Sequence, residues 1–220
     1  MLLLSVVLLV GAYVLLPFFL ENLIAEDLQS QFRLAEKPEV NLEGNPLNVL
    51  AGRFEGGHIT FTNPDLGGLH PDSVMVDLDP FDLDVLRSVT SGQVKSDRPL
   101  SGNLKMKLSE EEIDRIAAST AVVKDVKLEE GRVAVNFGPG NFGARVPVSV
   151  EGNLVLRDGM LHFEPDWVEA LGASVPQRLL RRMDFSYPIN GSPFAKALSN
   201  VEVHKDRLVL SGRMDNLPVG

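Results

Sequence analysis

The sequence has no cysteine among its 220 residues. This absence excludes a disulfide framework, a zinc site built on thiolates and a thiol nucleophile. Positive charge is also scarce, because 21 Lys and Arg stand against 30 Asp and Glu and give a formal net charge of -9. A pI near 4.9 argues against nucleic acid as the main partner. What remains is an acidic protein whose function does not depend on thiol chemistry.

Charge is missing altogether from the first twenty residues, where residues 2–20 form one apolar run. At about 1.5 Å per residue, a helix of this length spans roughly 28 Å, close to the roughly 30 Å of a hydrocarbon core. A cleaved signal peptide would need a basic start, a shorter apolar core and a small-residue cleavage site, and none is clear. We therefore predict a transmembrane anchor or uncleaved signal over residues 1–20.

The flank that follows this run is acidic, with Glu21, Glu26 and Asp27, and its first cation is Arg33. Cytoplasmic flanks are enriched in Lys and Arg, so their absence favours export of the body. The sequence thus predicts a single-pass plasma-membrane protein with an extracytoplasmic body.

The body begins with a helical period over residues 21–36 and then alternates between apolar and polar residues. Such alternation is typical of strands with one buried and one solvated face. The hairpin turns predicted between strands are Glu130-Gly131, Asp158-Gly159 and, less clearly because it lacks glycine, Lys205-Asp206. The predicted strands cover residues 40–42, 59–61, 74–78, 104–108, 126–128, 133–137, 146–150, 154–156, 161–163, 201–203 and 208–210.

Short helices interrupt these strands. Ser109 followed by Glu112 forms a capping box that predicts a helix start. Further helices are expected over residues 81–89, and over 166–171 continued by 176–183. The segment from Gly102-Asn103-Leu104 partly recurs at Gly152-Asn153-Leu154, which suggests two related strand-then-helix units. We predict an α+β fold: an N-terminal transmembrane helix, then one domain over residues 21–220 with a curved, mainly antiparallel sheet around amphipathic helices.

Motifs for catalysis fail on their context. Gly138 to Gly143 matches the dinucleotide-binding pattern, but an alternating strand follows where a helix is needed, so a hairpin loop is predicted. The Asp-rich stretch 77–84 lacks the glycine and glutamate of a calcium-binding loop. The four histidines are dispersed. We predict no catalytic set, no cofactor, no metal site and no enzymatic activity.

Two groups of residues remain as candidates for ligand binding. Arg178, Arg181 and Arg182 share one face of a predicted helix whose adjoining face holds Leu179. They fit either a surface helix or contact with lipid phosphates. The apolar residues outside the strands include Leu47, Leu50, Phe54, Leu69, Trp167 and Leu171. They fit either a filled core or an apolar trough.

Residues 38–61 resemble the signature segment of the LmeA-like phospholipid-binding family of actinobacterial cell-envelope proteins. The resemblance extends loosely over residues 23–215, and it departs at Asn45, where members usually carry an aromatic residue. The matching residues are Pro38, Val40, Gly44, Pro46, Leu47, Leu50, Gly52, Arg53 and Phe54.

The resemblance implies a half-barrel lipid-binding module with an apolar groove and a role in envelope lipid or lipoglycan assembly. On this basis we expect a membrane-anchored protein that binds phospholipid, contacts the bilayer and works with envelope-assembly proteins. The acyl chains would lie near Leu47, Leu50, Phe54, Phe61, Leu69, Trp167, Leu171 and Leu179, and the headgroups near Arg178, Arg181 and Arg182. The alternative is a non-catalytic interaction module with a filled core, and an enzyme ranks last.

Overall fold

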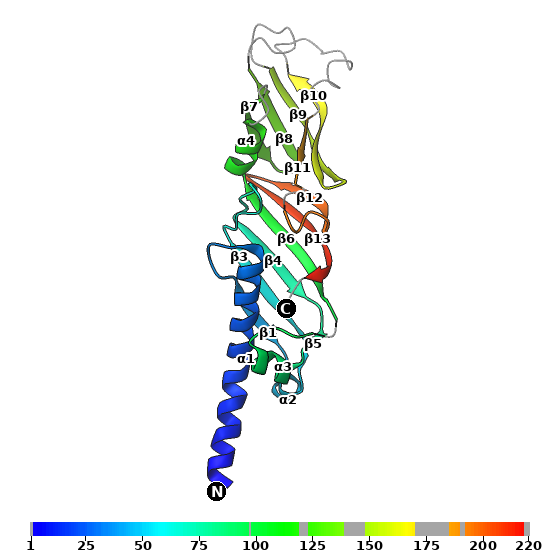
Figure 1. Ribbon diagram of the computed structural model, residues 1–220. Helices are drawn as coiled ribbons and strands as arrows, with labels where there is room; N and C mark the ends of the chain where they lie inside the picture. The colour runs from blue at the N-terminus through cyan, green and yellow to red at the C-terminus, as the bar shows by residue number, and fades with distance from the viewer. Residues whose placement is uncertain are drawn as a thin grey trace. The chain divides into compact units, whose positions relative to one another are not determined.

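The computed structural model describes residues 2–96, 98–118, 123–138, 148–169, 185–189 and 192–217 (Figure 1). The chain forms two compact units. Unit 1 comprises residues 1–64, 74–104 and 213–220, and unit 2 comprises residues 65–73 and 105–212. The predicted boundary at residue 20 lies inside one continuous helix of unit 1.

The fold is mainly antiparallel β, with a curled half-barrel sheet and few helices. The predicted curved, mainly antiparallel sheet is therefore confirmed. The helices are α1 (Leu2–Phe32), α2 (Pro46–Leu50), α3 (Val85–Ser91) and α4 (Glu110–Ala118). The strands are β1 (Glu39–Glu43), β2 (Arg53–Phe54), β3 (Gly56–Thr62), β4 (Ser73–Leu78), β5 (Phe81–Asp82), β6 (Leu100–Ser109), β7 (Val123–Glu129), β8 (Arg132–Phe137), β9 (Val148–Arg157), β10 (Met160–Glu169), β11 (Phe185–Pro188), β12 (Leu198–His204) and β13 (Arg207–Leu217).

The strands pair into three sheets. The largest has the order β1-β3-β4-β6-β13-β12, the second has the order β11-β10-β9-β8-β7, and β2 pairs with β5 alone. Each predicted strand falls within an observed one as far as the structure describes it. Residues 148–150 and 154–156 belong to the single long strand β9, and residues 146–147 of the first prediction lie outside the described residues. The alternation was therefore a reliable guide to the strands.

In unit 1, the second half of α1 packs against the sheet. Buried side chains recur every three or four residues along it, at Leu20, Leu23, Ile24 and Leu28. This spacing places them on one helical face. The ring of Phe32, at the end of α1, meets Phe61 of β3 edge-on at 6.0 Å between centroids. The helical period predicted for residues 21–36 thus marks a face of α1 that is buried in the core of unit 1.

The first half of α1 carries the uncharged run. Leu15, Phe18 and Phe19 are exposed there, in contrast to the packed residues that follow. Within the described part of the chain, no helix is long and apolar enough to span a membrane. The structure gives the transmembrane prediction for residues 1–20 no support.

In unit 2, α4 lies beside β7, and long strands β9 and β10 form the centre of the sheet. Ser109 accepts a hydrogen bond from the Glu112 N–H at 3.4 Å, so the predicted helix start at Ser109 is confirmed. The helix predicted over residues 166–171 is wrong for residues 166–169, because these continue β10 and pair with β9 beyond a register shift between Pro165 and Trp167. The remainder of that prediction, including 176–183, lies outside the described residues.

The predicted hairpin turns are confirmed. Gly131 and the pair Asp158-Gly159 have positive φ, and Asp206 reaches φ 62° without glycine. Strands β8 and β9 pair antiparallel, with Phe137 opposite Val148. The hairpin loop predicted over the Gly-rich segment falls mostly on residues 139–147, which lie outside the described residues. The helix predicted over residues 81–89 is confirmed from Val85 onward as α3, but it is wrong at Phe81-Asp82, which pair with β2 as strand β5. The elements that the sequence did not predict are short: α2, β2, β5 and β11.

Candidate functional site

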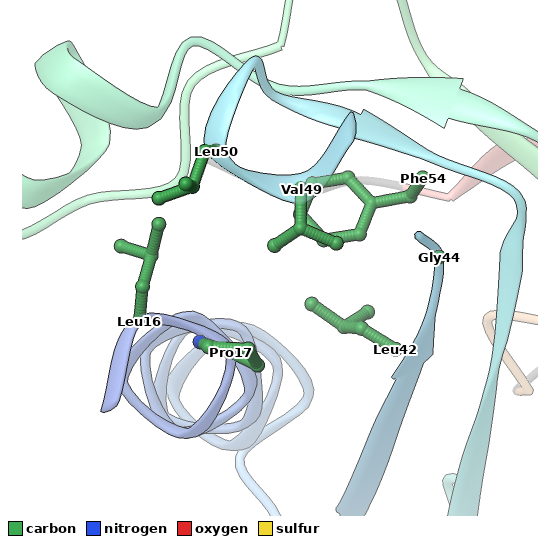
Figure 2. A pocket seen from close by; sticks show the side chains of 7 residues that line it. All are labelled: Leu16, Pro17, Leu42, Gly44, Val49, Leu50 and Phe54. Atoms are coloured by element: carbon green, nitrogen blue, oxygen red, sulfur yellow. The ribbon is translucent and has the colours of Figure 1, made fainter. Parts of the chain in front are cut away.

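An apolar pocket of about 100 Å³ lies in unit 1, beside the point where α1 becomes buried. Figure 2 shows its lining side chains converging on the space between α1 and α2. They come from four neighbouring parts of the unit: Leu16 and Pro17 of α1, Leu42 and Gly44 at the end of β1, Val49 and Leu50 of α2, and Phe54 of β2.

Helix α2 forms one wall of this pocket, and its start is specified locally. Asn45 is the N-cap, because its side-chain oxygen accepts a hydrogen bond from the Leu47 N–H at 3.1 Å. Pro46 then occupies the first helical position, where a missing N–H costs nothing. This short helix turns the buried Val49 into the pocket, while Leu47 stays exposed.

At the C-terminal end of α2, the backbone at Gly52 packs closely against the backbone at Leu83. Gly52 has φ 79°, and a Cβ built there would lie 2.1 Å from the Leu83 carbonyl oxygen. The Leu83 N–H in turn donates to the Gly52 carbonyl at 2.8 Å. A side chain at position 52 would therefore separate these two segments, which only glycine allows to approach so closely.

The floor of the pocket is aromatic. Phe54 is buried, and its ring stacks on Phe81 with centroids 5.0 Å apart and planes 12° apart. The pairing of β2 with β5 brings these two rings together. Gly44 contributes space, since a Cβ there would lie 3.0 Å from the Val49 Cγ2 atom. A pocket lined by these side chains can hold hydrocarbon by apolar burial.

The size of the pocket limits what it can hold. Its volume is smaller than the roughly 150 Å³ of an apolar cavity that accommodates benzene. It therefore has room for the end of an acyl chain and not for a whole lipid. Larger hollows in unit 2 are bordered by charged side chains such as Glu110, Lys127 and Lys205, which suit water better than acyl chains.

The structure places the predicted site residues in several different locations. Leu50 and Phe54 line the pocket, and Leu47 lies outside it on the surface of α2. Phe61 is buried against Phe32, and Leu69 is buried in unit 2. The backbone of Trp167 lies in β10. The predicted residues outside the described part of the chain are Leu171, Arg178, Leu179, Arg181 and Arg182.

Sequence reasoning missed five lining residues: Leu16, Pro17, Leu42, Gly44 and Val49. Gly44 was in view as part of the resembling segment, but its role as space beside Val49 is visible only in three dimensions. Leu16 and Pro17 fell within the run assigned to the membrane. The usable signal was Asn45-Pro46, a typical helix start that predicts inward-facing residues one turn later.

The Asp-rich stretch has structural partners in unit 1. Asp77 contacts His58 at 2.7 Å, and Asp79 accepts hydrogen bonds from Ser101 and Arg213. These two hydrogen bonds, that from Ser101 foremost, lower the pKa of Asp79. Asp84 caps α3 by accepting from the Arg87 N–H. Among the described residues, no group of three or more His, Asp or Glu could hold a metal ion.

A second cluster of ionisable groups lies in unit 2. The Glu112 carboxylate is only 7% exposed and accepts from the His70 N–H at 2.7 Å and from Arg115 Nε at 2.7 Å. Arg115 also donates to the Gly68 carbonyl. Burial raises the pKa of Glu112, but the hydrogen bonds from Arg115 and the His70 N–H outweigh it and lower the pKa. These contacts hold the loop at residues 68–70 against α4.

Comparison with known protein families identifies a relationship for this chain. The model of a family described as LmeA-like phospholipid-binding matches residues 11–213, which cover most of both units. No curated protein and no solved structure matches the chain.

Proposed function

Because the chain belongs to the LmeA-like phospholipid-binding family, we propose that it binds phospholipid and places the end of an acyl chain in the pocket of unit 1. The family match over residues 11–213 is the observation that carries this proposal. The apolar lining of the pocket supports this position for the acyl chain, since each methylene removed from water contributes about 0.8 kcal/mol to binding.

The small pocket volume shapes the proposed binding mode. Only the last carbons of an acyl chain enter the pocket, between Leu16 and Leu50, and the rest of the lipid stays outside it. Arg178, Arg181 and Arg182 remain our proposed headgroup contacts, on the sequence argument that guanidinium groups pair with phosphate. They lie outside the described residues.

We further propose that the protein works at a membrane, with its body outside the cytoplasm, in envelope lipid or lipoglycan assembly. The uncharged run of residues 2–20 supports membrane attachment, and its acidic flank supports the orientation. Assembly proteins of the envelope are the proposed partners.

The test of lipid binding is native mass spectrometry of the full chain, purified in mild detergent and released in the gas phase. We expect co-purified phospholipid on the wild type. Val49→Phe fills the pocket and should lower the bound fraction several-fold. Val203→Phe adds the same atoms at a half-buried position of β12 in unit 2 and should leave the bound fraction unchanged.

Two results would overturn the proposal. A wild-type chain that carries no phospholipid, even after incubation with phosphatidylglycerol or phosphatidylinositol vesicles, does not bind lipid in this way. A Val49→Phe chain that carries as much lipid as the wild type moves the acyl chain out of this pocket.

The second candidate is a non-catalytic interaction module, and the filled interior of the described sheets favours it. Inward-facing side chains such as Ile59, Val76, Leu104 and Met106 are almost fully buried. For such a module we expect no bound lipid, and instead co-elution with a partner protein that Val49→Phe leaves unchanged.

A further inference from the structure

Exposed large hydrophobic side chains are concentrated in one place. Among the described residues, all but one of them lie on α1, α2 and α3 of unit 1. Leu47 of α2 and Leu86 of α3 are each 75% exposed, and the exception is Met75 of β4 at 37%. The other exposed members on these helices are Leu15, Phe18, Phe19, Leu50 and Val89. We call the set on α2 and α3 the leucine patch: Leu47, Leu50, Leu86 and Val89.

Strand pairing and a backbone hydrogen bond hold α2 and α3 together. The pairing of β2 with β5 links the end of α2 to the start of α3, and the Leu83 N–H donates to Gly52. Asp84 caps the start of α3 and Gly92 ends it in the left-handed conformation. Figure 1 shows α2 and α3 next to each other beside α1. The two helices that carry the patch are therefore neighbours in unit 1.

The patch continues into the uncharged helix. Leu16 and Pro17 of α1 line the same pocket as Leu50 of α2, so the exposed residues Phe18 and Phe19 follow directly on the pocket wall. Several large apolar side chains exposed on neighbouring helices are typical of an interaction site on a protein. Since the leucine patch adjoins an uncharged run of residues 2–20, the occupant that fits both is the apolar layer of a bilayer.

The charges on α3 also fit this occupant. Arg87 is 77% exposed and pairs with the N-cap Asp84 at 3.3 Å, so the charge next to Leu86 on α3 is neutralised by a neighbouring carboxylate. A long Arg side chain can lay its stem along apolar surface and keep its head among polar groups. Attachment would then depend on buried apolar area and little on the sign of the lipid charge.

We propose that the leucine patch docks on the membrane, with Leu47 and Leu86 inserted at the boundary between headgroups and acyl chains. The inference rests on the proposed attachment of the chain to a membrane and adds the surface that faces it. Insertion at this boundary typically reaches roughly 5–10 Å. Docking brings the pocket beside Leu50 against the lipid layer, so an acyl chain can enter it without crossing water.

The absence of cysteine makes a direct test possible, because one introduced thiol labels one position. Leu47→Cys, Leu86→Cys and the control Met75→Cys are each labelled with an environment-sensitive NBD probe in the full chain. Each is reconstituted into phosphatidylcholine vesicles with and without spin-labelled lipid. We expect blue-shifted emission and at least two-fold quenching by spin-labelled lipid at positions 47 and 86, unchanged in high salt, and neither effect at position 75.

Each other outcome overturns the inference. Probes at 47 and 86 that behave like the probe at 75 place the patch in water. A blue shift without quenching means that protein, such as a second copy of the chain, covers the patch. Native mass spectrometry and vesicle flotation of the same preparations separate the two proposals. If lipid is bound but the probes at 47 and 86 report water, only the docking proposal is overturned. If the chain does not float with vesicles, membrane attachment and docking are both overturned.

Discussion

At the residue scale, His58 lies between two carboxylates on an exposed part of unit 1. Its Nδ1 atom lies 2.7 Å from Asp77 Oδ1, and its Nε2 atom lies 2.9 Å from Glu43 Oε1. The hydrogen bond with Asp77 raises the pKa of His58 more than burial lowers it, and the charges of Asp77 and Glu43 raise the pKa further. A histidine with a raised pKa stabilises the fold fully below its unfolded value of 6.5, and this contribution is lost as pH rises through the folded pKa.

We expect NMR titration of His58 in the wild type to give a pKa above 6.5. Asp77→Asn should lower this pKa more than Glu43→Gln does, because the Asp77 hydrogen bond is the largest cause of the shift. The melting temperature of the wild type, relative to His58→Gln, should decline as pH rises above 6.5 and through the raised pKa of His58. Equal effects of the two carboxylate variants would contradict this assignment.

Glu112 gives a second prediction at this scale. Glu112→Gln removes the charge that Arg115 and the His70 N–H contact, and it places an amide against the guanidinium. We expect a loss of about 1.5–3 kcal/mol in urea unfolding at pH 7, typical of hydrogen bonds to charged groups. Glu111→Gln, on the exposed side of α4, should change little.

The pH dependence of this effect has the opposite sign to that of His58. The pKa of Glu112 is lowered, so its contribution is present above the unfolded value of 4.5 and is lost as pH falls through the folded pKa. The difference between wild type and Glu112→Gln should therefore shrink in acid. A difference that stays constant from pH 7 to pH 3 would falsify the ionic reading of this contact.

At the element scale, helices cover the edges of both large sheets with carboxylates. Glu21 of α1 accepts a hydrogen bond from the Leu42 N–H in edge strand β1 at 3.0 Å. In unit 2, Glu110 and Asp114 of α4 accept from the Leu128 and Val126 N–H groups of edge strand β7. Unpaired edge groups are templates for aggregation, and these carboxylates occupy them.

The double variant Glu110→Ala/Asp114→Ala should expose the β7 edge. We expect hydrogen exchange of the Val126 and Leu128 amides to accelerate about two- to ten-fold, as the loss of roughly 0.5–1.5 kcal/mol per hydrogen bond implies. Light scattering on warming should begin earlier than for Glu111→Ala, which leaves both bonds in place. Unchanged exchange at both amides would mean that α4 does not protect this edge.

How far the sequence predicts an element depends on its length. Alternation over three to five residues found the longer strands, but β2 and β5 are two residues each and carry no period. Residues 166–169 were expected to be helical because Trp167 and Leu171 have helical spacing, yet the backbone groups of β9 offered them partners in a sheet. Over four residues, a helical and a strand period cannot be told apart, and the neighbouring strand decides.

The same limit applies to the candidate site. The segment from Gly44 to Phe54, which carries the family resemblance, forms much of the pocket wall, so the sequence located the right part of the chain. The sequence did not predict Leu16 and Pro17 as pocket residues, because an apolar run has the same composition whether it contacts lipid or packs beside α2.

At the scale of the whole molecule, the chain passes repeatedly between the two units. Unit 1 is completed only by residues 213–220, which follow the whole of unit 2. This last segment contributes the buried side chains of Met214 and Leu217 and the ion pair between Arg213 and Asp79 at 2.6 Å. Neither unit is a continuous piece of sequence, so the C-terminal strand stabilises the unit that contains the N-terminus.

A chain that ends at Gly212 should therefore lose stability in unit 1. We expect a loss of about 3–6 kcal/mol, since burial of each of the two apolar side chains contributes roughly 1.5–3 kcal/mol. Hydrogen exchange and proteolysis should increase in β4 and in the first half of β6. A chain that ends at Leu217 keeps these side chains and serves as the control, and equal protection in both chains would contradict the prediction.

The continuity of α1 has a consequence for the energetics of the proposed docking. A flexible tether lets a domain sample many orientations and dilutes any one of its surfaces to a millimolar effective concentration. Here the helix passes from its uncharged half into the packed face at Leu20 without an intervening loop. The rotation of unit 1 relative to the uncharged half of α1 is therefore restricted when the protein folds, before it contacts lipid. Weak insertion by Leu47 and Leu86 is then enough to hold the patch on the membrane, because the continuous helix already orients unit 1.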